Sequence, residues 1–151
     1  MKKLKKILIA VVVLLAILAA FFFYMFYMLN SASKLTEYDF GSDKIPSVNA
    51  VISEERKVTK FSSGVSTSSG QYKEYTYKSA SMLNDLSVYS THLRNNGWLV
   101  TQSYDLNTGK GEMQLAAESA DKGKIMIMSV AFEPEKYTIK ISKLEGTLTR
   151  K

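Results

Sequence analysis

The chain has 151 residues, no cysteine, and a formal net charge of +6 from 20 basic and 14 acidic residues. Without cysteine it forms no disulfide, has no thiol nucleophile and offers no thiol for lipid attachment. Four lysines stand in the first six positions, so the remainder has 16 basic and 14 acidic residues, a net charge of +2. So balanced a surface lacks a polyanion-binding groove, and we expect no nucleic-acid partner.

The first element is an uncharged apolar run from Ile7 to Leu29, preceded by a basic segment at residues 1–6. As a helix, its 23 residues span about 34 Å at about 1.5 Å per residue, enough to cross a hydrocarbon core of about 30 Å. The run predicts a transmembrane helix over residues 7–29, with the lipid bilayer as its partner. A signal peptide cleaved after Ser33 is the alternative, but signal apolar regions are shorter, about 7 to 15 residues.

Charge predicts the orientation of this helix. Lysines beside a first hydrophobic helix favour the cytoplasmic side, so the N-terminus is expected inside and the rest of the chain outside the cell membrane. Tyr24 and Tyr27 lie near the other end of the run, where tyrosine suits the headgroup level. The absence of cysteine fits a bacterial exterior. We therefore expect a single-pass signal anchor with an extracytoplasmic domain.

The segment of residues 30–46 mixes polar and charged residues with isolated Leu35, Tyr38 and Phe40, and it ends at Pro46. This composition predicts a stalk of low regularity, with the two aromatic residues docking onto the domain. The rest of the chain is the size of one domain with one core. The expected division is a cytoplasmic segment, a transmembrane helix, a stalk and an extracytoplasmic domain, at residues 1–6, 7–29, 30–46 and 47–151.

Two strands are expected at the start of the domain. Apolar residues alternate with polar ones within Val48 to Phe61, and the Ser- and Gly-rich segment Ser62 to Gly70 predicts a loop. Gln71 to Lys78 contains three tyrosines and a threonine, which favour a strand. The two strands form a predicted hairpin with a long tip.

A helix follows the second strand. Apolar residues recur at spacings of four, three and four, at Met82, Leu86, Tyr89 and Leu93. This spacing forms one face of an α-helix, with Ser79 or Ser81 available as its cap. Asn95 to Gly97 supplies residues that tolerate the left-handed conformation that ends helices.

The remaining chain predicts antiparallel strands joined by compact turns, at Trp98–Leu106, Met113–Ala117, Lys124–Glu133 and Tyr137–Ser142. Lys124–Glu133 is apolar on both faces and is expected at the centre of the sheet. The order is β-β-α-β-β-β-β, an α+β domain with a single helix packed on an antiparallel sheet. In outline it resembles helix-grip and cystatin-like architectures, which host enzymes, inhibitors and binding modules alike.

The residue pattern lacks a recognisable catalytic arrangement. The only histidine, His92, is predicted on the helix as an ordinary surface or boundary residue. Glu54 and Glu55 are adjacent, so on a strand they point to opposite faces. Gly109 to Gly111 fits a hairpin turn, because no helix follows it to complete a phosphate-binding loop. We expect no catalytic, cofactor-binding or metal-binding residues and no cofactor.

The tyrosines Tyr72, Tyr75 and Tyr77 are read as strand pairing partners, with stacking on a ligand as the alternative. The preferred function is therefore a non-enzymatic binding or accessory domain displayed at the membrane, with a membrane or envelope protein as partner. One alternative is a membrane-anchored hydrolase that uses His92 as its base. Another is a small subunit assembled through the transmembrane helix, where Ala16 and Ala20 form a small-xxx-small pair.

Overall fold

The structure is a computed structural model that describes residues 2–67, 70–102 and 104–149. Met1, residues 68–69 of the expected loop, residue 103 of the expected strand and residues 150–151 of the expected domain range lie outside the described part. In chain order the elements are α1 (Lys2–Ser33), β1 (Glu37–Phe40), β2 (Asp43–Pro46), α2 (Val48–Ile52), β3 (Lys57–Ser66), β4 (Gly70–Lys78), α3 (Met82–Asn95), β5 (Leu99–Gln102), the 3-10 turn η1 (Leu106–Thr108), β6 (Gly111–Glu118), β7 (Lys124–Glu133) and β8 (Lys136–Glu145).

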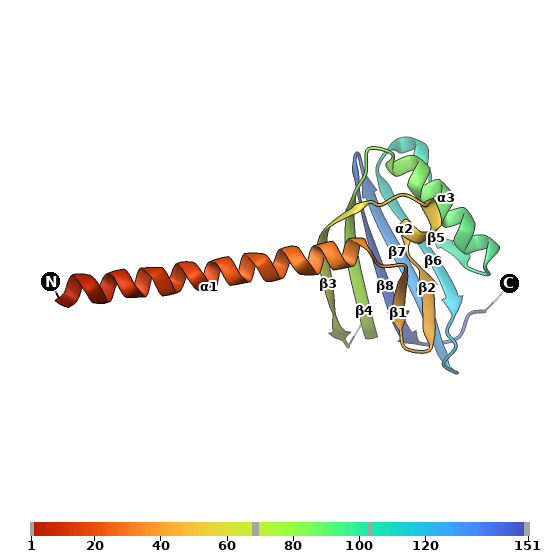
Figure 1. The fold of residues 1–151 in the computed structure, drawn as a ribbon. Coiled ribbons are helices and arrows are strands. Elements are labelled where there is room, and N and C mark those ends of the chain that lie inside the picture. The colour runs from red at the N-terminus through yellow and green to blue at the C-terminus, as the bar shows by residue number, and fades with distance from the viewer. Residues whose placement is uncertain (1, 68–69, 103, 150–151) are drawn as a thin grey trace.

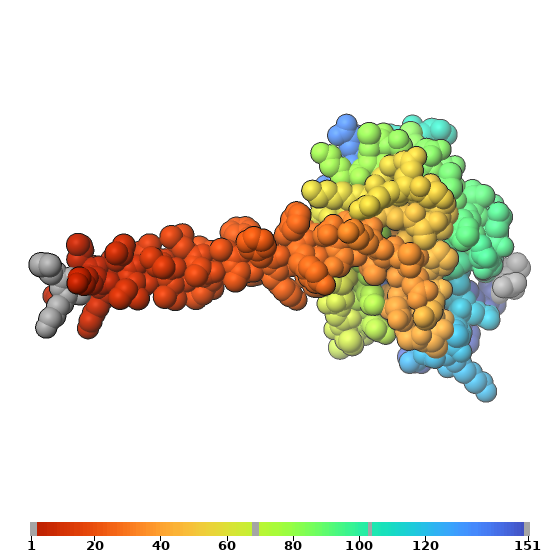
Figure 2. Space-filling model, in the orientation of Figure 1, coloured from red at the N-terminus to blue at the C-terminus, as the bar shows by residue number. Residues whose placement is uncertain are grey.

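Helix α1 projects from the domain as one continuous helix (Figures 1 and 2). Its most apolar 18-residue window has a mean hydropathy of 3.1, and none of that window is buried in the molecule. The helix is therefore long and apolar enough to cross a membrane, and the apolar side chains of that window have no cover within the described part of the chain.

The rest of the chain is built on a six-stranded antiparallel sheet in the order β3-β4-β8-β7-β6-β5. The α+β class and the predicted order of these strands and α3 are confirmed. Strand β7 lies between β8 and β6, as its apolar faces predicted. Its inner face is buried, at Met126, Met128, Val130 and Phe132. The outer face is less covered, since Ile125 and Ile127 are only partly buried.

The inner face of the sheet is covered by α3, α2 and the β1–β2 hairpin (Figure 1). The predicted apolar stripe of α3 is buried throughout, at Met82, Leu86, Tyr89 and Leu93. Neither expected serine caps the helix with its side chain: Ser81 occupies the N-cap without such a bond, and the Ser79 hydroxyl accepts from the Ser81 amide instead. Gly97 follows the helix end with φ +90°.

Residues 37–46 form a hairpin where a stalk of low regularity was expected. Strands β1 and β2 pair with Tyr38 opposite Ile45, and Gly41 lies in the turn with φ +78°. Tyr38, Phe40 and Ile45 are buried in the core. The expected docking of Tyr38 and Phe40 is confirmed, but the segment is regular because alternate residues of both short strands face the core.

Residues 48–52 are helical, so the expectation of a strand from Val48 to Phe61 is wrong over its first part. The Ser47 hydroxyl accepts from the Ala50 amide and caps α2. Strand β3 starts later, at Lys57, and runs to Ser66, pairing Ser62 with Glu74. Most of the described part of the expected loop is therefore strand.

The strand expected from Trp98 to Leu106 is shorter in the structure. Strand β5 ends at Gln102, and Leu106 begins the 3-10 turn, where the Asp105 carboxylate accepts from the Asn107 amide. Trp98 is buried, and its amide donates to the Leu93 carbonyl at 3.1 Å, so the chain folds back beside α3 as predicted.

Candidate functional site

The junction between α1 and the domain contains buried polar side chains that are hydrogen-bonded to the backbone. Helix α1 continues past Leu29 to Ser33, and in this last turn Leu29 is partly buried while Ala32 and Ser33 are buried. The Ser33 hydroxyl donates to the Leu29 carbonyl at 2.9 Å and accepts from the Val58 amide of β3 at 2.8 Å. The end of the apolar helix is thus bonded directly to an edge strand of the sheet.

Asn49 in α2 ties this junction to the segment before β3. Its amide nitrogen donates to the carbonyls of Ser33 at 2.6 Å and Arg56 at 3.0 Å, and its amide oxygen accepts from the Arg56 backbone N–H at 2.9 Å. Three segments therefore meet at one side chain. Because α2 is capped by Ser47 and Asn49 bonds both sides, the end of α1 is connected to the domain through α2.

Arg56 extends this connection to α3. Its guanidinium donates to Asp85 from Nε at 2.7 Å and from Nη2 at 2.9 Å, while Nη1 lies 2.6 Å from Glu54. The Asp85 side chain is 0% exposed and also accepts from Ser79 at 2.6 Å and Tyr137 at 3.4 Å. The hydrogen bond with Asp85 raises the pKa of Arg56. These hydrogen-bond donors offset the cost of burying the carboxylate away from water.

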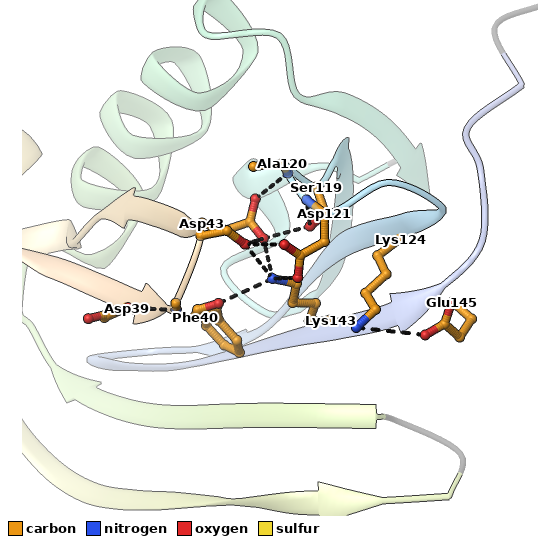
Figure 3. Close-up of polar contacts among 11 residues, drawn as sticks. Asp39, Phe40, Asp43, Ser119, Ala120, Asp121, Lys124, Lys143 and Glu145 are labelled. Carbon is orange, nitrogen blue, oxygen red and sulfur yellow. Dashed lines mark hydrogen bonds and ion pairs between the residues drawn. The ribbon is translucent and has the colours of Figure 1, made fainter.

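A second ion cluster fastens the β1–β2 turn to the sheet (Figure 3). The ammonium group of Lys143 on β8, with a side chain 6% exposed, lies 2.7 Å from Asp43 and 2.6 Å from Asp121. It also donates to the Phe40 carbonyl at 3.2 Å and to the Ser42 hydroxyl at 2.9 Å. One lysine thus closes the β1–β2 turn against the β6–β7 turn.

The pKa shifts in this cluster favour a structural role for Lys143, which we call the Lys143 clamp, over a reactive one. Burial opposes ionisation of Asp43, but hydrogen bonds from Lys143 and Ser119 outweigh it and lower the Asp43 pKa. The hydrogen bond from Lys143 also lowers the pKa of Asp121. Burial opposes the charge on Lys143, yet the two carboxylates raise its pKa. A nucleophilic lysine needs a lowered pKa, so Lys143 is unsuited to covalent catalysis.

The predicted tyrosine cluster mostly belongs to the core. Tyr75 and Tyr77 are buried, the Tyr77 hydroxyl shares a 2.6 Å hydrogen bond with that of Tyr38, and burial raises the pKa of Tyr75 to about 12. Tyr72 lies on the outer face, where the ammonium group of Lys140 is 5.1 Å from its ring centre. Two of the three rings are therefore closed to a stacking ligand.

The other residues considered from the sequence do not come together. His92 is partly buried on α3, and in the described part of the chain its imidazole makes no hydrogen bond or ion pair. Glu54 pairs with Arg56, whereas Glu55 is exposed. Gly109 to Gly111 is a turn that leads into β6. Among the described residues, no group of three or more His, Asp or Glu side chains is placed to hold a metal ion.

Two surface hollows flank α3 on the side of the domain away from α1. One, of about 550 Å³, lies between α3 and the 3-10 turn, and the other, of about 470 Å³, lies between α3 and β5. Thr91 and Arg94 line both. Large apolar side chains are exposed beside them at Leu83 and Val100. This face combines the guanidinium group of Arg94 and the carboxyl group of Asp105 with hydroxyl and apolar groups.

Comparison of the chain with protein-family models, with curated proteins and with solved structures found no match in any of the three. The likeness to helix-grip and cystatin-like architectures therefore stays one of outline.

Proposed function

We propose that this protein is a single-pass membrane protein in which α1 is retained as the anchor and holds a small binding domain at the outer surface of the cell membrane. The observation that supports this most strongly is that the last turn of α1 belongs to the core of the domain. Ala32 belongs to the core cluster and Leu29 packs against it, while the buried Ser33 is hydrogen-bonded to Val58 of β3 and Asn49 of α2. The helix is a structural part of the domain as well as an apolar segment.

This packing argues against a removed signal peptide. Cleavage after Ser33 would take away the acceptor of the buried Val58 amide and one of the acceptors of Asn49. It would also uncover the apolar surface that Leu29 and Ala32 protect.

The orientation follows from charge. Four lysines precede the apolar run, whereas Lys34 alone follows it closely. The lysine-rich end favours the cytoplasm, which places the domain outside.

The domain acts as a binding or accessory module for a membrane or envelope protein. The α3 face with Thr91 and Arg94 supports this role, because it lies far from α1 (Figure 1) and joins exposed apolar groups to two hollows. The hydrolase alternative gains no support, since His92 has no oriented partner in the described part of the chain.

Fractionation and labelling test the anchor. The full chain is expected to resist alkaline carbonate extraction from membranes. Because the chain has no cysteine, a Gln102→Cys variant carries one thiol on β5. A membrane-impermeant maleimide should label it in intact cells. Extraction by carbonate would contradict the anchor, and labelling only after lysis would contradict the orientation.

A pull-down from solubilised membranes tests the binding role. The full chain should recover a membrane or envelope protein, an Arg94→Glu variant should lose it, and a Lys140→Glu variant on the outer sheet face should keep it. Recovery of the bare monomer with every variant would contradict the proposal.

A further inference from the structure

Strand β3 is held close to the end of the apolar run. Ser33, which bonds the Val58 amide, lies four residues beyond Leu29, a rise of about 6 Å along a helix. The bonds of Asn49 to Ser33 and Arg56 fix this arrangement. Whatever surface surrounds α1 at Leu29 therefore lies within about one helical turn of Val58, near the start of β3.

The sheet extends away from this point. Figure 1 shows the strands running across the direction of α1, with β3 nearest to the projecting part of the helix and β5 farthest from it. The unpaired edge of β3 consequently faces the side from which α1 arrives. In a second copy anchored in the same membrane, the domain would stand beside the first one. It would therefore not reach an edge that faces the membrane.

The exposed groups of β3 need a partner of definite chemistry. An edge strand presents outward-facing N–H and C=O groups, and the Ser33 hydroxyl of α1 accepts from one of them, the Val58 amide. Lys57 and Lys60 are exposed, with the Lys60 ammonium group 3.9 Å from the Glu74 carboxylate on β4. Val65 is 84% exposed, more than any other large apolar side chain in the described part of the chain. Hydrogen-bond donors, ammonium groups and one apolar side chain thus share one edge.

We infer that the β3 edge docks on the phospholipid headgroup layer, an inference that rests on the proposed role of α1 as the anchor. Lipid phosphates accept hydrogen bonds from the free backbone N–H groups and from Lys57 and Lys60, and Val65 reaches the boundary of the acyl chains. Glu54 and Glu55 lie just before β3 and offset the positive charge of the two lysines. The contact therefore depends on hydrogen bonds to phosphate groups and on the depth of Val65 in the bilayer more than on net charge. Docking also shields an edge that would otherwise pair with other chains.

Single-cysteine fluorescence quenching tests the docking. The full chain is reconstituted into phosphatidylcholine–phosphatidylglycerol vesicles with a bimane label at Ser63→Cys on β3 or Gln102→Cys on β5. These residues lie on opposite edge strands of the sheet. A nitroxide on the lipid headgroup should quench the label at position 63 strongly and leave that at position 102 unquenched.

A third label separates this inference from the anchor itself. Phe22→Cys lies within the apolar run, and a nitroxide on the acyl chain should quench it. If position 22 is not quenched, the anchor fails and the docking fails with it. If position 22 is quenched while positions 63 and 102 respond alike, the anchor stands and docking of the β3 edge is overturned.

Discussion

The Ser33 hydroxyl accepts a hydrogen bond from the Val58 amide at 2.8 Å, and both residues are buried. This bond joins the end of the apolar helix to the first strand of the sheet. Because α1 ends inside the domain, no separate linker stands between the helix and the domain. The bond therefore affects both the stability of the fold and the placement of the domain.

Replacing Ser33 with Ala leaves the buried Val58 N–H without an acceptor. A buried unsatisfied donor costs about 1–3 kcal/mol, so the variant should lose about that much free energy of unfolding. Denaturant unfolding of the full chain in detergent micelles measures it. Ser31→Ala is the matched control, because Ser31 is exposed in the same helical turn. Equal stability of the two variants would contradict a structural role for the bond.

Replacing Asp85 with Asn removes one charge of the buried pair with Arg56. Breaking a buried ion pair from one side costs about 3–5 kcal/mol. Since the Arg56 side chain remains 17% exposed, the loss should fall near the lower end of that range. Glu54→Gln removes the other partner of Arg56, whose side chain is 64% exposed, and should cost less than about 1 kcal/mol. Similar losses in both variants would show that burial of Asp85 is unimportant.

The Lys143 clamp makes stability depend on pH. The pKa values of Asp43 and Asp121 are lowered in the fold, so their contribution is present above the unfolded pKa of about 3.9 and is lost as pH falls through the folded values. The pKa of Lys143 is raised, so its contribution is present below about pH 10.4 and is lost as pH rises through the folded value.

Lys143→Met tests this dependence. Without the ammonium group, Asp43 and Asp121 lose the hydrogen bonds from Lys143 that lower their pKa values, so both pKa values rise towards those of the unfolded chain. The variant should therefore be less stable at neutral pH but lose less stability than the parent chain on acidification, because the folded and unfolded pKa values of the two carboxyl groups then differ less. Unfolding free energies between pH 3 and 8 measure how much stability each variant loses on acidification, with Lys124→Met as control because its pair with Glu145 is exposed. If both variants lost the same amount of unfolding free energy on acidification, the Lys143 clamp would be contradicted.

A methyl group at Gly70 should destabilise the hairpin formed by β3 and β4. Both Gly70 and Gly41 have positive φ, at 55° and 78°, which costs an L-residue about 1–2 kcal/mol. Only at Gly70 does the added Cβ overlap another group, the Lys143 carbonyl oxygen, since nothing lies within 4 Å at Gly41. Gly70→Ala should thus lower the melting temperature more than Gly41→Ala. The reverse order would show that the close approach to β8 is not real.

Elements with long, clear periodicity were predictable from the sequence. The stripe of α3 runs the length of the helix, and β7 is apolar at nearly every position, so pattern alone placed both correctly. Short elements were not. Val48 to Ile52 alternates like a strand, and only the capping serine at position 47, three residues before Ala50, signals that the segment is helical.

The polar clusters were beyond the reach of sequence reasoning. Arg56 and Asp85 are 29 residues apart, and Lys143 lies 101 residues from Ser42. No local spacing links them, because the contacts arise from the order of strands in the sheet. The junction at Ser33 was hidden for another reason: the apolar run ends at Leu29, whereas the helix continues for one more turn into the core.

Intact-mass spectrometry of the protein extracted from cell membranes tests the central claim most directly. If α1 is retained as an integral part of the domain, the mass corresponds to a chain that still contains residues 7–33. A mass corresponding to a chain that begins at Lys34 would contradict the account, because the junction of Ser33 with Val58 and Asn49 would then be absent from the mature protein.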